Sequence, residues 1–364
     1  FRPPDWEFRF TPVINVNYSE LDEILGVNVN PGRGETRTDG HIGIQAAFVD
    51  KHLRNVSDRY DFDSVRFGIQ PFSSDFRGFL FQDNQFGVRL FGNRDNNVFQ
   101  YNLAWFRRLE KDTNSGLNHL GKALRDDDVF VANLYWQDFP RKGFISQATV
   151  LHNSNREDQD FYYDENGFIQ RPAWIGGERP RAYEVTYLGL NGDGHFGRLN
   201  LTASLYFAFG ESDPGTFAER KTDIAAAFGA AELSMDFDWI RPRLSLLWAS
   251  GDDDPYDDQD NGFDAVFENP PFAGADTSYW IRQAVPLVGG GRVALAGRNA
   301  LLPSLRASKE EGQSNFTNPG LWLAGLGVDL DILPELRTSA NWNYLRFDRT
   351  EVLEAARNQA PIDN

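Results

Sequence analysis

The chain has 364 residues and a formal net charge of −17, from 53 acidic and 36 basic side chains, with 30 Phe, 12 Tyr and 9 Trp. This acidic excess argues against a nucleic-acid-binding protein, which needs clustered Lys and Arg to contact phosphates. Without Cys, disulfides, thiolate metal sites and Cys nucleophiles are excluded. No segment reaches the roughly 18 consecutive apolar residues of a membrane-spanning helix.

The first predicted strand covers residues 6–18. Its even positions are apolar with aromatic residues at both ends, whereas most odd positions, Arg9 among them, are polar. Two-residue alternation predicts a strand with one apolar and one wet face. Aromatic rings at both ends are typical of a lipid-facing strand, because amphipathic rings settle at the two membrane surfaces.

Further strands follow in the same pattern. The second is expected to point Ile42, Ile44, Ala46 and Phe48 outward. Segments 65–71, 86–92 and 98–109 place Arg66, Arg89 and Arg108 on the opposite, inward face. Segments 129–137, 144–153 and 181–191 alternate less regularly.

The clearest strand is 198–209, RLNLTASLYFAF, in which Leu205, Phe207 and Phe209 alternate with Ser204 and Tyr206. Its length fits the roughly 9 to 11 residues with which a tilted strand crosses a bilayer. Segments 223–238, 240–250, 321–332 and 336–347 complete a series of about thirteen strands.

The connections alternate in length. Links at 92–97, 138–143, 192–197, 238–239 and 333–335 are short, whereas 19–40, 110–127, 154–180, 210–222 and 251–319 are long. Short periplasmic turns and long external loops are typical of outer-membrane barrels. One link, 51–63, is long although it lies at the end where the other links are short. Segment 72–84 is apolar enough to fold into the lumen, and a packed surface loop is the alternative.

These observations predict an all-β fold, a transmembrane antiparallel up-and-down β-barrel in the bacterial outer membrane. Residues 1–364 form one domain, with 251–319 as a long extracellular loop. A complete barrel of about 14–18 strands is expected, because single-chain bacterial barrels have even strand numbers and leave no edge in lipid. We therefore expect the C-terminal closing strand or strands to be missing from this sequence.

Arginines recur on the inward face of the predicted strands. The set is Arg9, Arg66, Arg89, Arg108, Arg241, Arg243 and Arg337. A guanidinium facing lipid near the midplane costs roughly 2 to 4 kcal/mol, which favours a lumenal orientation. Two interpretations stay open: a cationic lining that attracts anions, or ion pairs that brace the wall. Partners for the second would be inward acids, namely Glu7, Glu184, Glu232, Asp236, Asp329 and Asp331.

Two groups of segments carry a family resemblance. SGDDDP at 250–255 with GFDAVF at 262–267, and VRFGIQPF at 65–72 with QFGVRLFG at 85–92, resemble motifs of the alginate export family of outer-membrane proteins. The family's GRQ motif reads Gly68, Ile69, Gln70 here, so its arginine is absent. The resemblance implies a wide, 18-stranded type of barrel and passive transport of a polysaccharide or another solute. At the matched positions it implies Arg66, Gln70 and Arg89 as lumenal, substrate-binding residues.

The acidic loop 251–268 contains a near match to a calcium loop. Asp257, Gln259, Asn261, Gly262 and Glu268 fall at its first, third, fifth, sixth and twelfth positions. The candidate metal ligands are Asp257, Asp258, Asp260 and Glu268. The alternative is a solvated acidic rim without calcium. No other cofactor is expected, and no GxSxG elbow or other nucleophile context predicts an enzyme.

The pattern favours a passive outer-membrane channel, porin-like or an export conduit, for an anionic or polar solute such as a polysaccharide or oligosaccharide. Its expected partners are outer-membrane lipid and lipopolysaccharide, together with a periplasmic or extracellular protein. Two other classes stay open. One is a barrel plugged by its loops or a partner, serving as a scaffold, adhesin or sleeve. The other is a soluble secreted all-β protein such as a propeller or solenoid.

Overall fold

The computed structural model describes residues 4–20, 36–165, 167, 169–171, 180–215, 217–274, 284–286, 292–294 and 310–357. Within them, fourteen strands form one sheet, in which thirteen follow each other as antiparallel neighbours. These are β1 (Trp6–Glu20), β2 (Thr36–Asn55), β3 (Phe62–Ser73), β4 (Gln82–Arg94), β5 (Phe99–Arg107), β6 (Asp127–Gln137), β7 (Phe144–Arg156), β10 (Ala182–Phe196), β11 (Leu199–Ser212), β12 (Thr222–Met235), β13 (Ile240–Ala249), β17 (Leu321–Leu333) and β18 (Leu336–Arg346). The predicted all-β, up-and-down fold is confirmed.

The remaining elements are short. β14 (Gln259–Asp260) adds a parallel pairing to β12. Two small hairpins join β8 (Tyr162–Tyr163) to β9 (Ile169–Arg171) and β15 (Ala284–Pro286) to β16 (Arg292–Ala294). The helix α1 (Glu351–Arg357) follows β18. In the described residues no helix has the length and apolar character needed to cross a membrane.

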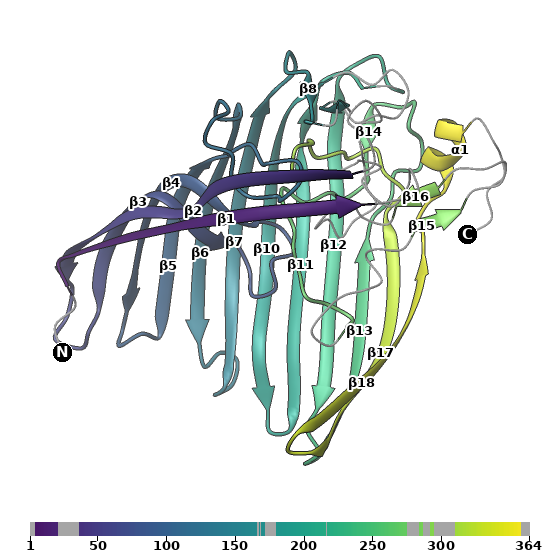
Figure 1. Ribbon diagram of the computed structural model, residues 1–364. Helices are drawn as coiled ribbons and strands as arrows, with labels where there is room; N and C mark the ends of the chain where they lie inside the picture. Colours follow the sequence, from purple (N-terminus) through teal and green to yellow (C-terminus); the bar gives the residue numbers. More distant parts are fainter. Residues whose placement is uncertain are drawn as a thin grey trace.

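The sheet is strongly curved, and Figure 1 shows β1 and β2 crossing the view at a large angle to β10–β13. Each strand is rotated relative to its neighbour, and these rotations add up along the sheet, so the first strands lie at a large angle to the later ones. The strand order ends at β1 on one side and at β18 on the other, and these two strands do not pair in the described residues. The described sheet is therefore open between them.

The two faces of the sheet differ, as the alternation predicts. On β11, Leu205, Phe207 and Phe209 are 39%, 52% and 47% exposed, whereas Ser204 and Tyr206 are buried. The exposed residues point to the convex side and the buried ones to the concave side, where other segments cover them. The prediction for 198–209 is confirmed.

A β-bulge changes the prediction for β2. Its register against β1 shifts between Thr11 and Pro12, where Gln45 has no partner of its own. An extra residue moves every later side chain to the other face. Ile42 is therefore 70% exposed as predicted, whereas Phe48 is 5% exposed and lies on the concave face. The outward assignment of Ala46 and Phe48 was wrong.

Strand connections at one end of the sheet are short turns, and those at the other are long (Figure 1). We call these the turn end and the loop end. Asp95, Asn96 and Asn97 all have φ near +60° in the β4–β5 turn, and Asp138 and Asp238 have similar values in the β6–β7 and β12–β13 turns. Asn and Asp tolerate this conformation best among non-glycine residues. The link predicted at 51–63 is only the turn 56–61, because β2 and β3 extend further than predicted.

Loop segments fill part of the concave side. We call residues 74–81, 261–273 and 310–320 the plug. Phe79, Phe263 and Phe316 are at most 2% exposed. Their rings lie against Phe228, Tyr187 and Tyr183 of the wall, with centroids 5.2, 5.9 and 5.8 Å apart. Of the two alternatives for segment 72–84, the structure shows the inward fold.

Hydrogen bonds fix the first plug segment to the wall. The Asp75 carboxylate accepts bonds from the backbone N–H groups of Gly78, Phe79 and Leu80, at 2.6, 3.1 and 3.2 Å. The buried Tyr206 hydroxyl of β11 donates to the same carboxylate at 2.9 Å. Gly78 has φ +75°, which only glycine adopts readily and which lets the chain turn around Asp75.

Candidate functional site: a polar cavity beside the plug

Two arginines meet on the concave face of β3 and β4. Arg66 and Arg89 are direct register partners. Arg66 donates to Asp50 at 2.7 and 3.2 Å, and its guanidinium lies 4.2 Å from the Phe48 ring centroid. Arg89 instead donates to the neutral Asn102 side chain at 2.7 Å and lies 4.8 Å from the Phe91 ring centroid. Among the described residues Arg89 has no carboxylate partner.

The other predicted arginines are ion-paired. The N–O distances are 4.0 Å for Arg9–Glu7, 3.0 Å for Arg108–Asp127, 3.4 Å for Arg243–Asp329 and 3.2 Å for Arg337–Asp331, and Arg241 pairs with Asp236. Five of the seven predicted arginines thus pair with acids at these contacts, and Arg66 pairs with Asp50, so wall bracing describes most of the set. Glu184, expected to point inward, is exposed on the convex face beside buried Tyr183 and Val185.

Two predicted lining residues are buried in protein. Arg108 lies just after β5, is 0% exposed and contacts Asp127 and the Phe267 ring. It therefore does not face open space, because plug residue Phe267 covers it. Gln70 is also 0% exposed and donates to the Gly87 carbonyl oxygen across β3 and β4 at 3.2 Å.

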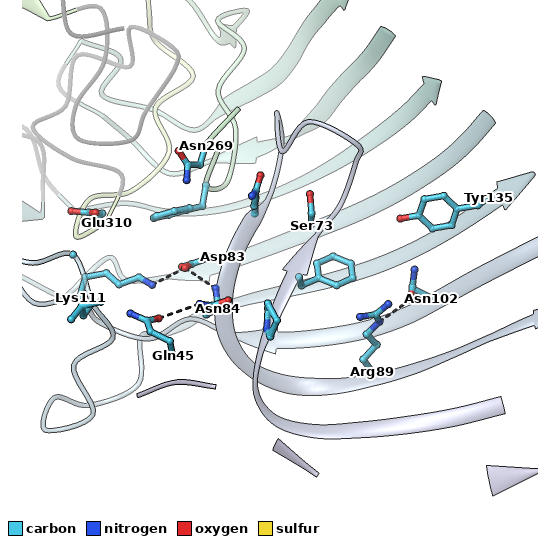
Figure 2. A pocket seen from close by; sticks show the side chains of 16 residues that line it. Gln45, Ser73, Asp83, Asn84, Arg89, Asn102, Lys111, Tyr135, Asn269 and Glu310 are labelled. Carbon is cyan, nitrogen blue, oxygen red and sulfur yellow. Dashed lines mark hydrogen bonds and ion pairs between the residues drawn. The ribbon is translucent and has the colours of Figure 1, made fainter. Parts of the chain in front are cut away.

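Arg89 lines a cavity of about 560 Å³ between the wall and the plug. Figure 2 shows Arg89, Asn102 and Tyr135 toward one end and Lys111 and Glu310 toward the other. Phe72 of the wall and Phe267 and Asn269 of the plug also line it. Among the described residues that line it, Arg89 is a cation without an acid partner, and the others supply amides, hydroxyls and aromatic rings.

Several of these residues were not predicted from sequence. Lys111, in the β5–β6 loop, is 2% exposed. Its ammonium group forms an ion pair with Asp83 at 2.8 Å and donates a hydrogen bond to the Asn118 side-chain oxygen at 2.7 Å. Asn84 and Gln45 form a hydrogen bond at 3.2 Å across the cavity wall. Strand alternation could have placed Asn102 and Tyr135 inward, but a loop lysine carries no such signal.

A buried ionic cluster holds the last plug segment. Arg125 is 1% exposed and donates to both Glu157 carboxylate oxygens at 2.8 Å. It also donates to the carbonyl oxygens of Glu310 and Gly312, at 3.3 and 2.8 Å. Burial alone would raise the pKa of Glu157, but the Arg125 and Arg171 guanidiniums outweigh it and hold that pKa at about 2. The plug is thereby anchored by charge-assisted bonds.

Two acids in the same region have raised pKa values. Asp252 is 0% exposed, and burial raises its pKa to about 8 against the bond from the Asn261 N–H. Burial likewise raises the pKa of Glu311 to about 7, although the Thr113 hydroxyl donates to it at 2.8 Å. Both groups lie in loops at the loop end of the sheet.

The predicted calcium ligands do not come together. Asp260 accepts hydrogen bonds from the Thr222 and Thr317 hydroxyls, each at 2.7 Å. Asp257 accepts the Gln259 backbone N–H at 2.7 Å, and Glu268 is 0% exposed. Asp258 is exposed. In the part of the chain that the structure describes, no group of three or more His, Cys, Asp or Glu side chains has a geometry that could hold a metal ion.

No family model and no curated protein matches this chain. Solved structures do match it at low similarity, and two of them are aligned over 95% of this chain. Outer-membrane expressed OmpT of Vibrio cholerae is 10% identical with a TM-score of 0.37, and 88% of that chain is covered. OpdK of Pseudomonas aeruginosa, crystallised with vanillate, is 13% identical with a TM-score of 0.40, and 84% of that chain is covered. At these values neither carries an argument about solute or mechanism, and the alginate export resemblance stays a prediction.

Proposed function

We propose that the chain forms the wall of an outer-membrane β-barrel and acts as a passive, non-enzymatic channel for an anionic or polar solute. The observation that supports it most is the segregation of the two sheet faces. Apolar side chains cover the convex face, while charged and amide side chains and the plug occupy the concave face. Soluble proteins rarely expose apolar patches beyond a few hundred Å². A bilayer would cover this face.

The aromatic residues support a membrane position. At the turn end, Trp136 and Trp239 are 41% and 58% exposed. At the loop end, Trp322 and Tyr344 are 43% and 52% exposed. Two aromatic belts at opposite ends of a lipid-facing surface match the two membrane interfaces. The loop end would then face the outside of the cell, because external loops are the long ones.

The cavity beside the plug is the proposed solute route. It passes Arg89, which has no acid partner among the described residues. A fixed cation in a narrow aqueous passage lowers the barrier for anions. Amide and hydroxyl groups of Asn102 and Tyr135 supply hydrogen bonds, and Phe72 supplies an apolar face.

A second candidate is a plugged scaffold barrel that carries no solute. The dense packing of Phe79, Phe263 and Phe316 against the wall favours it. Such a protein would serve adhesion or hold a partner, and its loops would seal the lumen.

Planar-bilayer recording distinguishes the two candidates. We expect discrete single-channel currents, with a reversal potential in a KCl gradient that reports anion preference. Properly inserted protein that stays silent would favour the scaffold. Protein that remains monodisperse without detergent would reject both, because a lipid-facing surface of this size needs detergent.

A further inference from the structure

The convex face carries a hollow over β12, β13, β17 and β18, with a volume of about 640 Å³. We call it the convex groove. Register places Gly229, Trp248, Trp322 and Arg346 in one row across the four strands. Ala231, Leu246, Ala324 and Tyr344 form the adjacent row, two residues nearer the turn end.

Small side chains make the floor of the convex groove. A Cβ atom added to Gly229 would meet only the Leu205 side chain, at 3.9 Å, within a 4 Å radius. Ala231 and Ala324 are the other small outward residues that line it. Larger neighbours, Leu246, Trp248 and Tyr344, form its walls. The groove is therefore an unfilled apolar channel on a face that would contact lipid.

A cation stands at the loop end of the convex groove. Arg346 is exposed and makes no ion pair or hydrogen bond through its side chain to another described residue. The nearby Asp348 carboxylate is hydrogen-bonded to other groups. It accepts the indole N–H groups of Trp248, at 3.1 Å, and Trp322, and its second oxygen accepts the Gly251 N–H at 2.9 Å.

We propose that the convex groove binds the lipid A part of an outer-leaflet lipopolysaccharide, with an acyl chain over Gly229 and Ala324 and a phosphate on Arg346. This inference rests on the proposed function, which places the loop end at the outer leaflet. Charge complementarity selects this occupant, since guanidinium binds phosphate with two parallel hydrogen bonds. An apolar channel with a cation at one end matches an anionic amphiphile.

A second hollow offers a matched control. It lies on the convex face of β4–β7 and has a volume of about 420 Å³. Leu90, Leu103 and Ala132 are among the residues that line it. It is apolar, and no arginine or lysine is among the described residues that line it. An acyl chain that merely dissolves in any surface hollow would use both. Lipid A whose binding depends on its phosphate would bind only in the convex groove.

The experiment is native mass spectrometry of the detergent-solubilised, delipidated protein titrated with purified lipid A. Gly229→Leu fills the groove and Arg346→Ala removes the cation, whereas Ala132→Leu fills the control hollow. We expect at least a tenfold loss of bound lipid A for the first two variants and none for the third. Dephosphorylated lipid A should bind wild type and Arg346→Ala equally.

Three results would overturn the lipid site: loss of binding by Ala132→Leu as large as by Gly229→Leu, full binding by Arg346→Ala, or a doubled protein mass that Gly229→Leu abolishes. The last would assign the groove to a second copy of the chain. Conductance is recorded on the same samples, because the groove lies outside the lumen. Wild type that conducts without binding lipid A rejects the site and leaves the channel proposal standing.

Discussion

Arg66 and Arg89 face each other directly across β3 and β4, but only Arg66 contacts a carboxylate among the described residues. Two like charges at such close range repel, and Asp50 cancels one of them. The remaining positive charge is directed into the cavity. This charge is the one expected to act on anion selectivity under the channel proposal, because Asp50 neutralises Arg66 and leaves Arg89 without a carboxylate partner among the described residues.

Arg89→Gln is expected to shift the reversal potential toward cation preference and to lower conductance for anionic solutes. The cause is loss of the unpaired cation, since Asn102 remains available to bond a glutamine. Arg337→Gln is the matched control: this arginine pairs with Asp331 and is about 60% exposed at the turn end. If both variants shift selectivity equally, net charge and not position controls it.

Tyr206→Phe should loosen the first plug segment. The hydroxyl bond to Asp75 is lost, at a cost of about 1 kcal/mol for a typical buried bond. We expect more frequent open-state fluctuations in single-channel traces, with little change in barrel stability. Asp75→Ala removes that bond and the four backbone N–H bonds to the same carboxylate, so its effect should be larger. Traces identical to wild type in both variants would show that the segment does not limit the current.

Arg125→Met removes the closer of the two basic partners of the buried Glu157 and leaves only Arg171, at 3.7 Å; breaking a buried pair typically costs about 3 to 5 kcal/mol. Heat-modified electrophoretic mobility would measure the loss as a lower unfolding temperature. The double variant Arg125→Met with Glu157→Leu should recover much of it, because no isolated charge remains. Equal loss in single and double variants would point to the Glu310 and Gly312 carbonyl bonds instead.

Asp252 gives the loop end a pH dependence. Its folded pKa of about 8 lies above the ordinary 3.8, so the folded loop binds the proton more tightly than the unfolded loop. Stability is therefore greatest below the ordinary value and declines as the pH rises toward about 8. Proteolytic cleavage within 251–262 should accelerate over this range. Asp252→Asn should flatten the profile, and an unchanged slope would assign the effect to another group.

The sequence alone determined the strands and the polarity of their faces. Each strand is defined by its own alternation, as in 198–209, and a lipid-facing surface needs no distant partner to be recognised. The turn end was predicted for the same reason, since its short turns are local. Even the number of long strands in the meander followed from counting local patterns.

Tertiary structure decided what lies inside. The bulge at Gln45 turned Phe48 inward because pairing with β1, not the local pattern of β2, fixes the register there. Arg125 joins Glu157 to a carbonyl oxygen at Glu310, and Arg89 faces plug residues across the cavity. Such contacts join segments far apart in sequence. Which arginines are neutralised and which stays open is set by the three-dimensional arrangement of loops, for which no two-residue period exists.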